Sequence, residues 1–124
     1  METIRIKATD VSPEVIFSPE DKKYMIAGWS RPESPFLFYA PIIKWIEDYG
    51  EKHLNNATVD FKMGYFNTPS VRVIRKILDQ LAQLHQKGVK MTVNWYYDNE
   101  GSKEEFVHEF ATGLALPVNY IQKH

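Results

Sequence analysis

Two polar segments of this sequence carry the hydroxyls and carboxylates that could do chemistry. They are Tyr65–Ser70 and Tyr96–Ser102. Each segment follows a run in which apolar and polar residues alternate, which is typical of a β-strand, and each precedes a run with helical spacing. Functional sites of open α/β sheets tend to form where parallel strands end and helices begin. We therefore expect the two segments to lie at one edge of a sheet if their strands are neighbours.

Thr68 is the hydroxyl with the most specific potential. It is well placed as the N-cap of the helix that follows, with Pro69 as the first helical residue. A phosphate on Thr68 would lie against the free N–H groups of the helix, and Arg72, one turn further on, could reach it. The phosphate would add a charge of about −1.5 to −2 to the surface presented to a partner. Ser70 is a rival acceptor, and a plain helix cap worth about 1 kcal/mol is the simplest alternative role for Thr68.

Two other kinds of chemistry have weaker support. Asp98 and Glu100 could serve a metal-assisted phosphohydrolase, but their loop lacks the spacing of a calcium site and no base–nucleophile pair accompanies it. Trp29, Trp95 and Tyr96 could line the apolar pocket of a small-ligand-binding domain. The four histidines lack metal-motif spacing, and no nucleophile elbow, P-loop or dinucleotide fingerprint occurs. We therefore expect no catalytic residue, no metal site and no cofactor.

Composition limits the class of protein further. The chain has 124 residues, so we expect a single domain over residues 1–124. With 15 basic and 16 acidic residues its net charge is −1, and nothing indicates binding to nucleic acid. The absence of cysteine excludes disulfides and thiolate chemistry. The sequence shows neither a signal peptide nor an apolar run of about 20 residues, so we expect a cytoplasmic protein without membrane insertion.

Periodicity predicts the elements that position these residues. Strands with alternating faces are expected at Ile4–Ala8, Glu14–Phe17, Lys23–Trp29, Ala57–Tyr65, Val89–Tyr97 and Val118–Ile121. Helical spacing covers about Ser34–Lys52, where Pro41 either bends the helix or marks its regular start. A second helix runs from Thr68 and stops at Gly88. A third helix opens at Ser102, with Glu105 completing a capping box.

The pattern of these elements predicts the architecture. Residues Ala57–Tyr97 form a strand–helix–strand unit, whose strands should be parallel with a right-handed crossover. Every clear strand is polar on one face, whereas the strands of a doubly wound sheet read as apolar runs. We therefore expect an α/β two-layer sandwich, in which helices pack on one face of a mixed β-sheet. The other face would be open to water or to a partner.

An ordered set of motifs across nearly the whole chain resembles the SiaC family of bacterial regulatory phosphoproteins. The motifs are Ile6-Lys7-Ala8-Thr9, Ser12-Pro13-Glu14-Val15, Gly28, Pro32-Glu33, Phe38-Tyr39, Pro41, Trp45-Ile46, Phe61-Lys62, Tyr65-Phe66-Asn67-Thr68, Ser70 and Trp95-Tyr96-Tyr97. The resemblance implies a fold like the STAS (SpoIIAA-like) anti-sigma-factor-antagonist domains. It also implies a partner-switching role without catalysis.

The resemblance further implies who the partners are. A dedicated Ser/Thr kinase would phosphorylate Thr68, and a PP2C-type phosphatase would remove the phosphate. The unphosphorylated protein would bind and activate a diguanylate cyclase, raising cyclic di-GMP and favouring biofilm. Candidate partner-binding residues are Asn67, Pro69, Arg72, Tyr96 and Asp98. Pro69 departs from the small residue usual in the family and could alter kinase recognition, and the acidic stretch after Tyr97 is shorter than the family pattern.

Overall fold

Six strands form one mixed sheet, in which each strand lies beside its neighbours in sequence. The computed structural model describes residues 2–123. The strands are β1 (Ile4–Ile6), β2 (Glu14–Ser18), β3 (Lys23–Ser30), β4 (Thr58–Phe66), β5 (Thr92–Tyr97) and β6 (Val118–Gln122). Strands β1 to β3 pair antiparallel, and β3 to β6 pair in parallel, as predicted for β4 and β5. The parallel strands therefore end along one side of the sheet, the carboxyl edge, which the β1–β2 loop also reaches.

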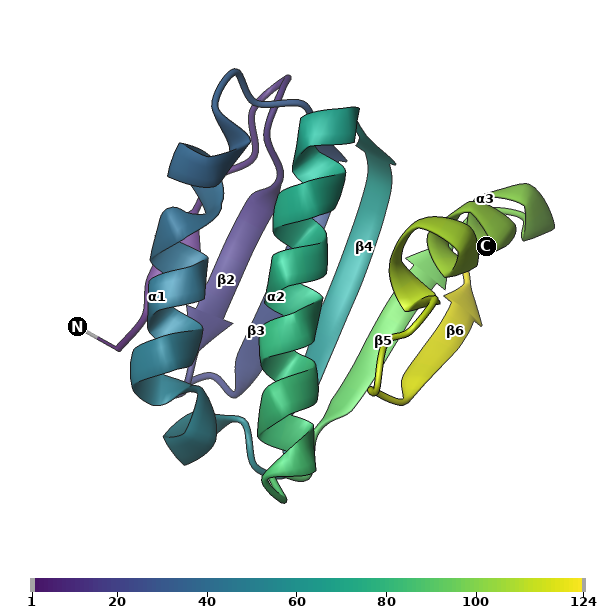
Figure 1. The fold of residues 1–124 in the computed structure, drawn as a ribbon. Coiled ribbons are helices and arrows are strands. Elements are labelled where there is room, and N and C mark those ends of the chain that lie inside the picture. The colour runs from purple at the N-terminus through teal and green to yellow at the C-terminus, as the bar shows by residue number, and fades with distance from the viewer. Residues whose placement is uncertain (1, 124) are drawn as a thin grey trace.

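The helices cover a single face of this sheet (Figure 1). They are α1 (Pro35–His53), α2 (Thr68–Gln86) and α3 (Glu100–Phe106), which continues into a π-helical turn, η1 (Val107–Ala111). Helices α1 and α2 lie side by side over β2 to β4, while α3 and η1 lie over β5 and β6. The predicted two-layer sandwich is confirmed. None of the helices in residues 2–123 is both long enough and apolar enough to cross a bilayer.

One core fills the space between the helices and the sheet. Its fully buried members include Phe17, Ile26, Phe61, Tyr39, Ile42, Ile74, Leu78, Leu81, Phe106 and Phe110. Burying each such side chain stabilises the fold by about 1.5–3 kcal/mol. At the α3 end the core is aromatic: Trp95 stacks on Phe106 with 4.0 Å between ring centroids and on Phe61 with 5.4 Å. The apolar face of α2, which includes Ile74, Ile77, Leu78 and Leu81, is buried in this core, and the fully buried ring of α1 is Tyr39.

Several element boundaries differ from the prediction because neighbouring loops use the backbone. β5 begins at Thr92 rather than Val89, since the Val89 N–H donates to the Leu84 carbonyl and closes the end of α2. The Lys90 N–H donates to the side-chain oxygen of Asn55 at 2.8 Å. β1 ends at Ile6. Helix α1 continues through Pro41, and Gly88, with φ of 102°, ends α2 as predicted.

The predicted N-cap of the third helix, Ser102, was wrong by three residues. α3 begins at Glu100, and its N-cap is Asn99. The Asn99 side chain accepts from the Ser102 N–H at 3.0 Å, and the Ser102 hydroxyl accepts from the Asn99 N–H at 3.2 Å. Ser102 is therefore the inner member of the capping box and not its start, because asparagine caps a helix at least as well as serine.

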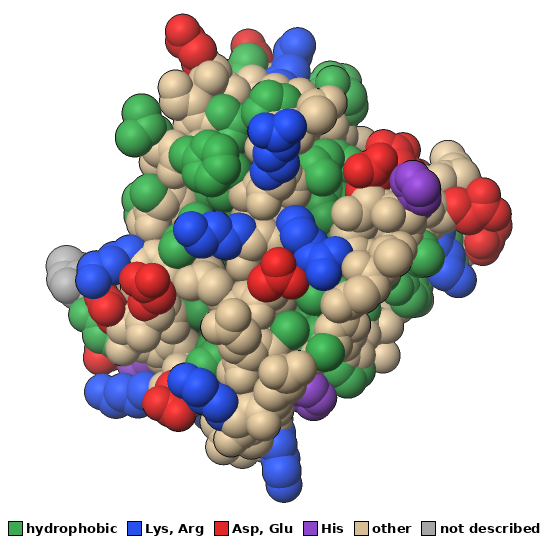
Figure 2. Space-filling view, in the orientation of Figure 1, with side chains coloured by type: hydrophobic (Ala, Val, Ile, Leu, Met, Phe, Trp, Pro, Cys, Tyr) green, Lys and Arg blue, Asp and Glu red, His purple; other side chains and the backbone are tan. Residues whose placement is uncertain are grey.

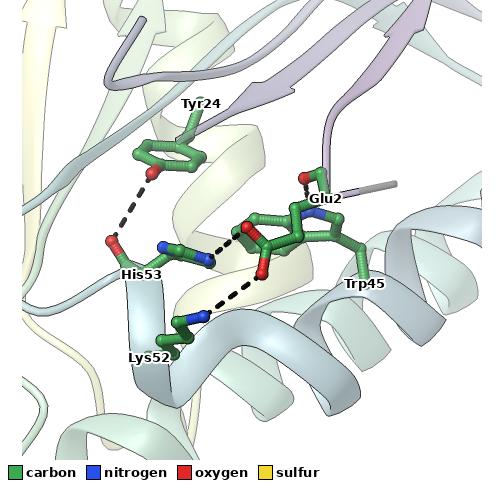
Figure 3. A network of polar contacts seen from close by, with 5 residues as sticks. All are labelled: Glu2, Tyr24, Trp45, Lys52 and His53. Atoms are coloured by element: carbon green, nitrogen blue, oxygen red, sulfur yellow. Dashed lines mark hydrogen bonds and ion pairs between the residues drawn. The ribbon is translucent and has the colours of Figure 1, made fainter. Parts of the chain in front are cut away.

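A polar network ties the segment before β1 to the end of α1 (Figure 3). The indole N–H of Trp45 donates to the Glu2 carbonyl, while the Glu2 carboxylate lies 3.2 Å from His53 and 3.3 Å from Lys52. Hydrogen bonds from His53 and then Lys52 hold the pKa of Glu2 below its ordinary value. The network thus fixes the outer strand of the sheet against the helix layer.

We expect replacement of Glu2 by Gln to reduce the loss of free energy of unfolding that the protein undergoes as pH falls. Because its folded-state pKa is depressed, Glu2 stabilises the protein above its unfolded pKa, and this contribution disappears as pH falls through the folded value. Urea unfolding at about pH 6 and about pH 3 should show a smaller acid-induced loss for E2Q than for the parent. E47Q, on the exposed side of α1, is the matched control. Equal acid-induced losses in E2Q and the parent would contradict the role given to Glu2.

Candidate functional site

Ser30, the last residue of β3, lies where three elements meet at the carboxyl edge. Its hydroxyl lies 2.6 Å from the hydroxyl of Tyr39 in α1 and donates to the hydroxyl of Ser70 in α2 at 2.9 Å. Its carbonyl accepts from the Asn67 N–H at 2.9 Å and from the Ser70 hydroxyl at 3.2 Å. Ser30, Tyr39 and Ser70 are completely buried. This hydroxyl cluster therefore fixes the start of α2 relative to both α1 and the sheet.

The first turn of α2 is capped by Asn67, so the prediction of Thr68 as N-cap was wrong. Asn67 has extended backbone geometry, and its side-chain oxygen accepts from the Ser70 N–H at 3.1 Å. The amide side chain of Asn67 takes the capping role because asparagine is at least as good a cap as threonine. Thr68 and Pro69 are then the first two helical residues, and both are exposed.

The two hydroxyls in this turn have opposite environments. Thr68 faces solvent, and its hydroxyl makes no hydrogen bond within residues 2–123, whereas Ser70 is fully buried and both donates and accepts inside the hydroxyl cluster. A kinase active site can reach the first hydroxyl without unfolding the helix, but not the second. Thr68 is therefore the accessible hydroxyl of the two, and Ser70 has a structural role.

A hollow beside Thr68 brings α2 and α3 together. It is lined by Phe66, Thr68, Val71, Arg72, Glu105 and Glu109. The structure thus places Arg72 next to Thr68, as expected from the helical spacing. It also places two carboxylates, Glu105 and Glu109, across the hollow, which the sequence analysis missed. Their i, i+4 spacing was visible in the sequence, but the position of α3 and η1 relative to α2 was not.

A second hollow adjoins the first where β4 and β5 separate. The two strands pair only as far as Phe61 and Trp95, although β4 continues to Phe66. The space between them is lined by residues of both strands and of α3, including Phe66, Tyr96, Asp98 and Glu105. The hollows share Phe66 and Glu105, so Tyr96 and Asp98 lie near the same opening as Thr68. The expected convergence of the two polar segments at one edge is confirmed.

The residues of the weaker hypotheses are placed differently. Trp95 is 2% exposed and belongs to the aromatic core, whereas Trp29 is 53% exposed, so the structure does not combine them in one pocket. Tyr96 is half-buried beside Trp95. Asp98 lies 4.0 Å from Lys123, and Glu100 is an exposed residue in the first turn of α3. Within residues 2–123, no group of three or more His, Asp or Glu side chains is arranged to hold a metal ion.

Exposed apolar side chains gather at the carboxyl edge, near Thr68. The most exposed large apolar residues of the described chain are Val11, Trp29, Phe36, Leu37, Tyr65 and Val107. All except Val107 lie in loops, strand ends or helix starts at this edge. Figure 2 shows hydrophobic side chains over the end of the molecule where α1 and α2 begin. An exposed apolar surface of this kind is typical of a protein interaction site.

Comparison with known proteins yields one consistent family. The model described as SiaC family regulatory phosphoprotein matches residues 6–123. An uncharacterized protein of Pseudomonas aeruginosa (strain UCBPP-PA14) is 26% identical over 125 residues, covering 100% of this chain and 98% of that protein. The crystal structure of apo-SiaC from Pseudomonas aeruginosa is similar with a TM-score of 0.85 and 24% identity, over 98% of this chain and 99% of that one.

A further similar structure contains a complex. It is the diguanylate cyclase SiaD with its activator SiaC, also from Pseudomonas aeruginosa. The matched chain has a TM-score of 0.85 and 24% identity, over 97% of this chain and 99% of that one. These likenesses show that the fold is shared along the full described length.

The assignment of the N-cap of α2 to Asn67 and not to Thr68 can be tested by stability measurements. N67A should lower the free energy of unfolding by about 1 kcal/mol, because the Ser70 N–H loses its acceptor. T68A should change it by less than about half that amount, because an exposed residue without a cap bond is removed. Urea denaturation of both variants at neutral pH provides the comparison. A larger loss for T68A than for N67A would restore Thr68 as the cap.

The buried Tyr39 predicts a specific alkaline instability. Burial raises the pKa of Tyr39 to about 12, against a smaller opposing effect of the Ser30 hydrogen bond. Because the folded value exceeds the unfolded value of about 10, this stabilisation is complete below pH about 10 and is lost as pH rises to about 12. Y39F should lose about 1 kcal/mol at neutral pH through the missing hydrogen bond.

At about pH 11.5 the parent protein and Y39F should be about equally stable, or Y39F should be the more stable of the two. The parent loses up to about 2 kcal/mol through Tyr39 ionisation, while Y39F has no such group. Tyr24 and Tyr120, whose pKa values are also raised by burial, are present in both proteins and cancel. Urea unfolding at about pH 8 and about pH 11.5 measures the difference. A constant gap between the two proteins would show that Tyr39 does not titrate on unfolding.

Proposed function

This chain belongs to the SiaC family of regulatory phosphoproteins, and we propose that it is a partner-switching protein controlled by reversible phosphorylation of Thr68. In its unphosphorylated form it binds and activates a diguanylate cyclase in the cytoplasm. A Ser/Thr kinase adds the phosphate and a PP2C-type phosphatase removes it. The protein acts by binding and not by catalysis.

The position of Thr68 supports this proposal most directly. Thr68 is the exposed hydroxyl of its turn, and the buried Ser70 two residues later fixes the backbone on which it sits. The phosphate can therefore be added without disturbing the fold. Because exposed apolar side chains surround the same edge, a partner bound there would have to bury the phosphate or be released.

The charges beside Thr68 make the phosphate effective. The adjoining hollow holds one cation, Arg72, and two carboxylates, Glu105 and Glu109, so its formal charge is −1. A phosphothreonine carries about −2 and would bring this to about −3. Arg72 can pair with the phosphate, but the carboxylates of Glu105 in α3 and Glu109 in η1 remain unbalanced. Phosphorylation therefore makes this side of the edge strongly anionic, and a partner that fits the neutral form is rejected.

The choice of partner follows from the relatives. The similar SiaC of Pseudomonas aeruginosa is the activator of the diguanylate cyclase SiaD. The shared family and the fold similarity along the full described length support an equivalent partner here. Tyr96, Asp98, Pro69 and Arg72 lie beside the two hollows or the exposed turn, which makes them candidate contacts of the cyclase or of the modifying enzymes.

Binding of Thr68 variants to the cyclases of the same organism tests the switch. Purified T68A should bind one of them and raise its synthesis of cyclic di-GMP, whereas T68D should bind at least about tenfold more weakly, because a carboxylate introduces part of the phosphate charge. Calorimetry gives the affinities, and a nucleotide assay gives the activation. The parent protein phosphorylated at Thr68 should behave as T68D or more severely.

S70A and K76A are the matched controls. S70A should lower stability but leave the phosphate incorporated by the kinase unchanged, because Ser70 is buried. K76A removes an exposed residue of α2 that lines neither hollow, so it should leave binding of the unphosphorylated form within about twofold. Equal affinity of T68A and T68D for every cyclase of the organism would refute the proposal, and so would phosphate mapped to Ser70 in the native protein.

A further inference from the structure

Trp29 is an exposed aromatic residue held in place by an irregular backbone. Its side chain is 53% exposed, whereas Trp45 and Trp95 are each 2% exposed. The pairing of β3 with β4 shifts between Gly28 and Trp29, so that Gly28 lies opposite Met63 but Trp29 lies opposite Tyr65. Gly28 has φ of 127°, which other residues rarely adopt. Such bulges re-aim side chains and are common beside functional sites, and here the extra residue in β4 brings Tyr65 to the face that carries Trp29.

Gly64 is the residue of β4 that the shift leaves unpaired, and it gives the Trp29 ring its place. A Cβ atom at Gly64 would lie 3.1 Å from the indole nitrogen of Trp29, which is too close for an ordinary contact. The ring therefore lies against the bare backbone of β4. Tyr65 packs beside it with 5.6 Å between ring centroids and is itself 45% exposed. The two rings form a firm aromatic surface on the sheet face without helices.

Two cations complete this surface. The guanidinium of Arg31 lies over the Trp29 ring, 5.7 Å from its centroid, and the ammonium of Lys62 lies 5.1 Å from the centroid of Tyr96. Neither cation is in an ion pair with a carboxylate among residues 2–123, although Arg5, Lys52 and Arg75 are. Within residues 2–123, the guanidinium of Arg31 donates only to the Asp10 carbonyl, at 3.5 Å. Both positive charges thus remain free to pair with an incoming anion.

We propose that the open sheet face around Trp29, Tyr65, Arg31 and Lys62, here called the Trp29 platform, is a docking surface for an acidic segment of the diguanylate cyclase that also carries apolar side chains. This inference rests on the proposed function and adds the surface that the partner uses. Tryptophan, tyrosine and arginine are the residues that most often dominate the energy of an interface. The free cations call for carboxylates of the partner at the rim of the rings.

The charges on the same face distinguish this partner from a nucleic acid. The strand register places Glu14 and Asp60 on the side of the sheet that carries Lys62. A continuous polyanion would meet these carboxylates as well as the cations, whereas a protein segment can present single carboxylates to Arg31 and Lys62. The net charge of −1 gives no general attraction for a polyanion either.

Fluorine NMR of protein labelled with 5-fluorotryptophan can observe the Trp29 platform directly. The chain has three tryptophans, and the spectrum of W29F assigns the exposed one. The unlabelled cyclase that binds T68A in the experiment above is then added. The Trp29 signal should shift or broaden on its addition. A soluble gadolinium chelate broadens the signals of exposed rings. Its broadening of the Trp29 signal should be at least about threefold smaller in the complex than in the free protein, because the partner covers the ring. The buried Trp45 and Trp95 signals should keep their chemical shifts.

Affinities of matched variants test the energy of the contact. W29A and R31E should each weaken cyclase binding by at least about tenfold, and W29F should restore part of the loss. V107A, an exposed apolar truncation on the helix layer, and K76E, an exposed charge reversal on α2, should change it by less than about twofold. All these side chains are exposed, so unfolding midpoints should stay close to the parent value. The T68D effect should persist in V107A.

The outcomes separate the two proposals. Cyclase binding that depends on Thr68 but leaves the Trp29 signal and the W29A affinity unchanged would overturn the docking surface and leave the switch intact. Absence of binding of T68A to any cyclase of the organism would overturn the switch and with it this assignment. Tighter binding of a fluorescent dT oligonucleotide than of the cyclase, lost in W29A, would replace the acidic segment by a nucleic acid and likewise overturn it.

Discussion

The hydroxyl cluster of Ser30, Tyr39 and Ser70 is the interaction on which the carboxyl edge depends. Each member comes from a different element, and all three are completely buried. A buried hydroxyl without a partner costs about 1–3 kcal/mol, so the cluster is stable only when all three elements are in place. The first turn of α2 therefore has one position relative to α1 and β3. Thr68 inherits that position although it takes no part in the cluster.

This arrangement supports the proposed switch, in which phosphorylation of Thr68 changes binding without changing the fold. The bonds that hold the turn lie beneath it, and the Asn67 cap lies before it, so Thr68 carries little of the structural energy. A phosphate is then free to act through charge and solvation alone. Had Thr68 been the cap itself, its modification would have competed with the capping bond of the helix.

Most of the fold could be predicted from the sequence, because the spacing of apolar residues shows which face of a strand or helix is buried. The alternation in β4 and β5 indicated a sheet with one covered face, and the spacing of Ile74, Ile77 and Leu81 indicated the face of α2. The choice between Asn67 and Thr68 as cap could not be predicted, since both residues are good caps and only the backbone decides. The long-range contacts of Ser30 and the approach of Glu105 to Thr68 depend on how elements pack, which local patterns do not record.

The bulge in β4 beside Trp29 is another feature that local sequence patterns do not predict, and it indicates where a partner could bind. In the sequence, Trp29 continues the expected strand and could equally have belonged to an apolar pocket. Regular alternation along β3 places Trp29 on the open face, Gly64 leaves room for its ring, and the extra residue in β4 brings Tyr65 to the same face, at the cost of exposing two large rings to water. Without the extra residue, alternation from the buried Met63 would have turned Tyr65 toward the helices. The exposed ring is therefore better explained by a binding partner than by the stability of the sheet. The free cations Arg31 and Lys62 favour a partner that carries carboxylates.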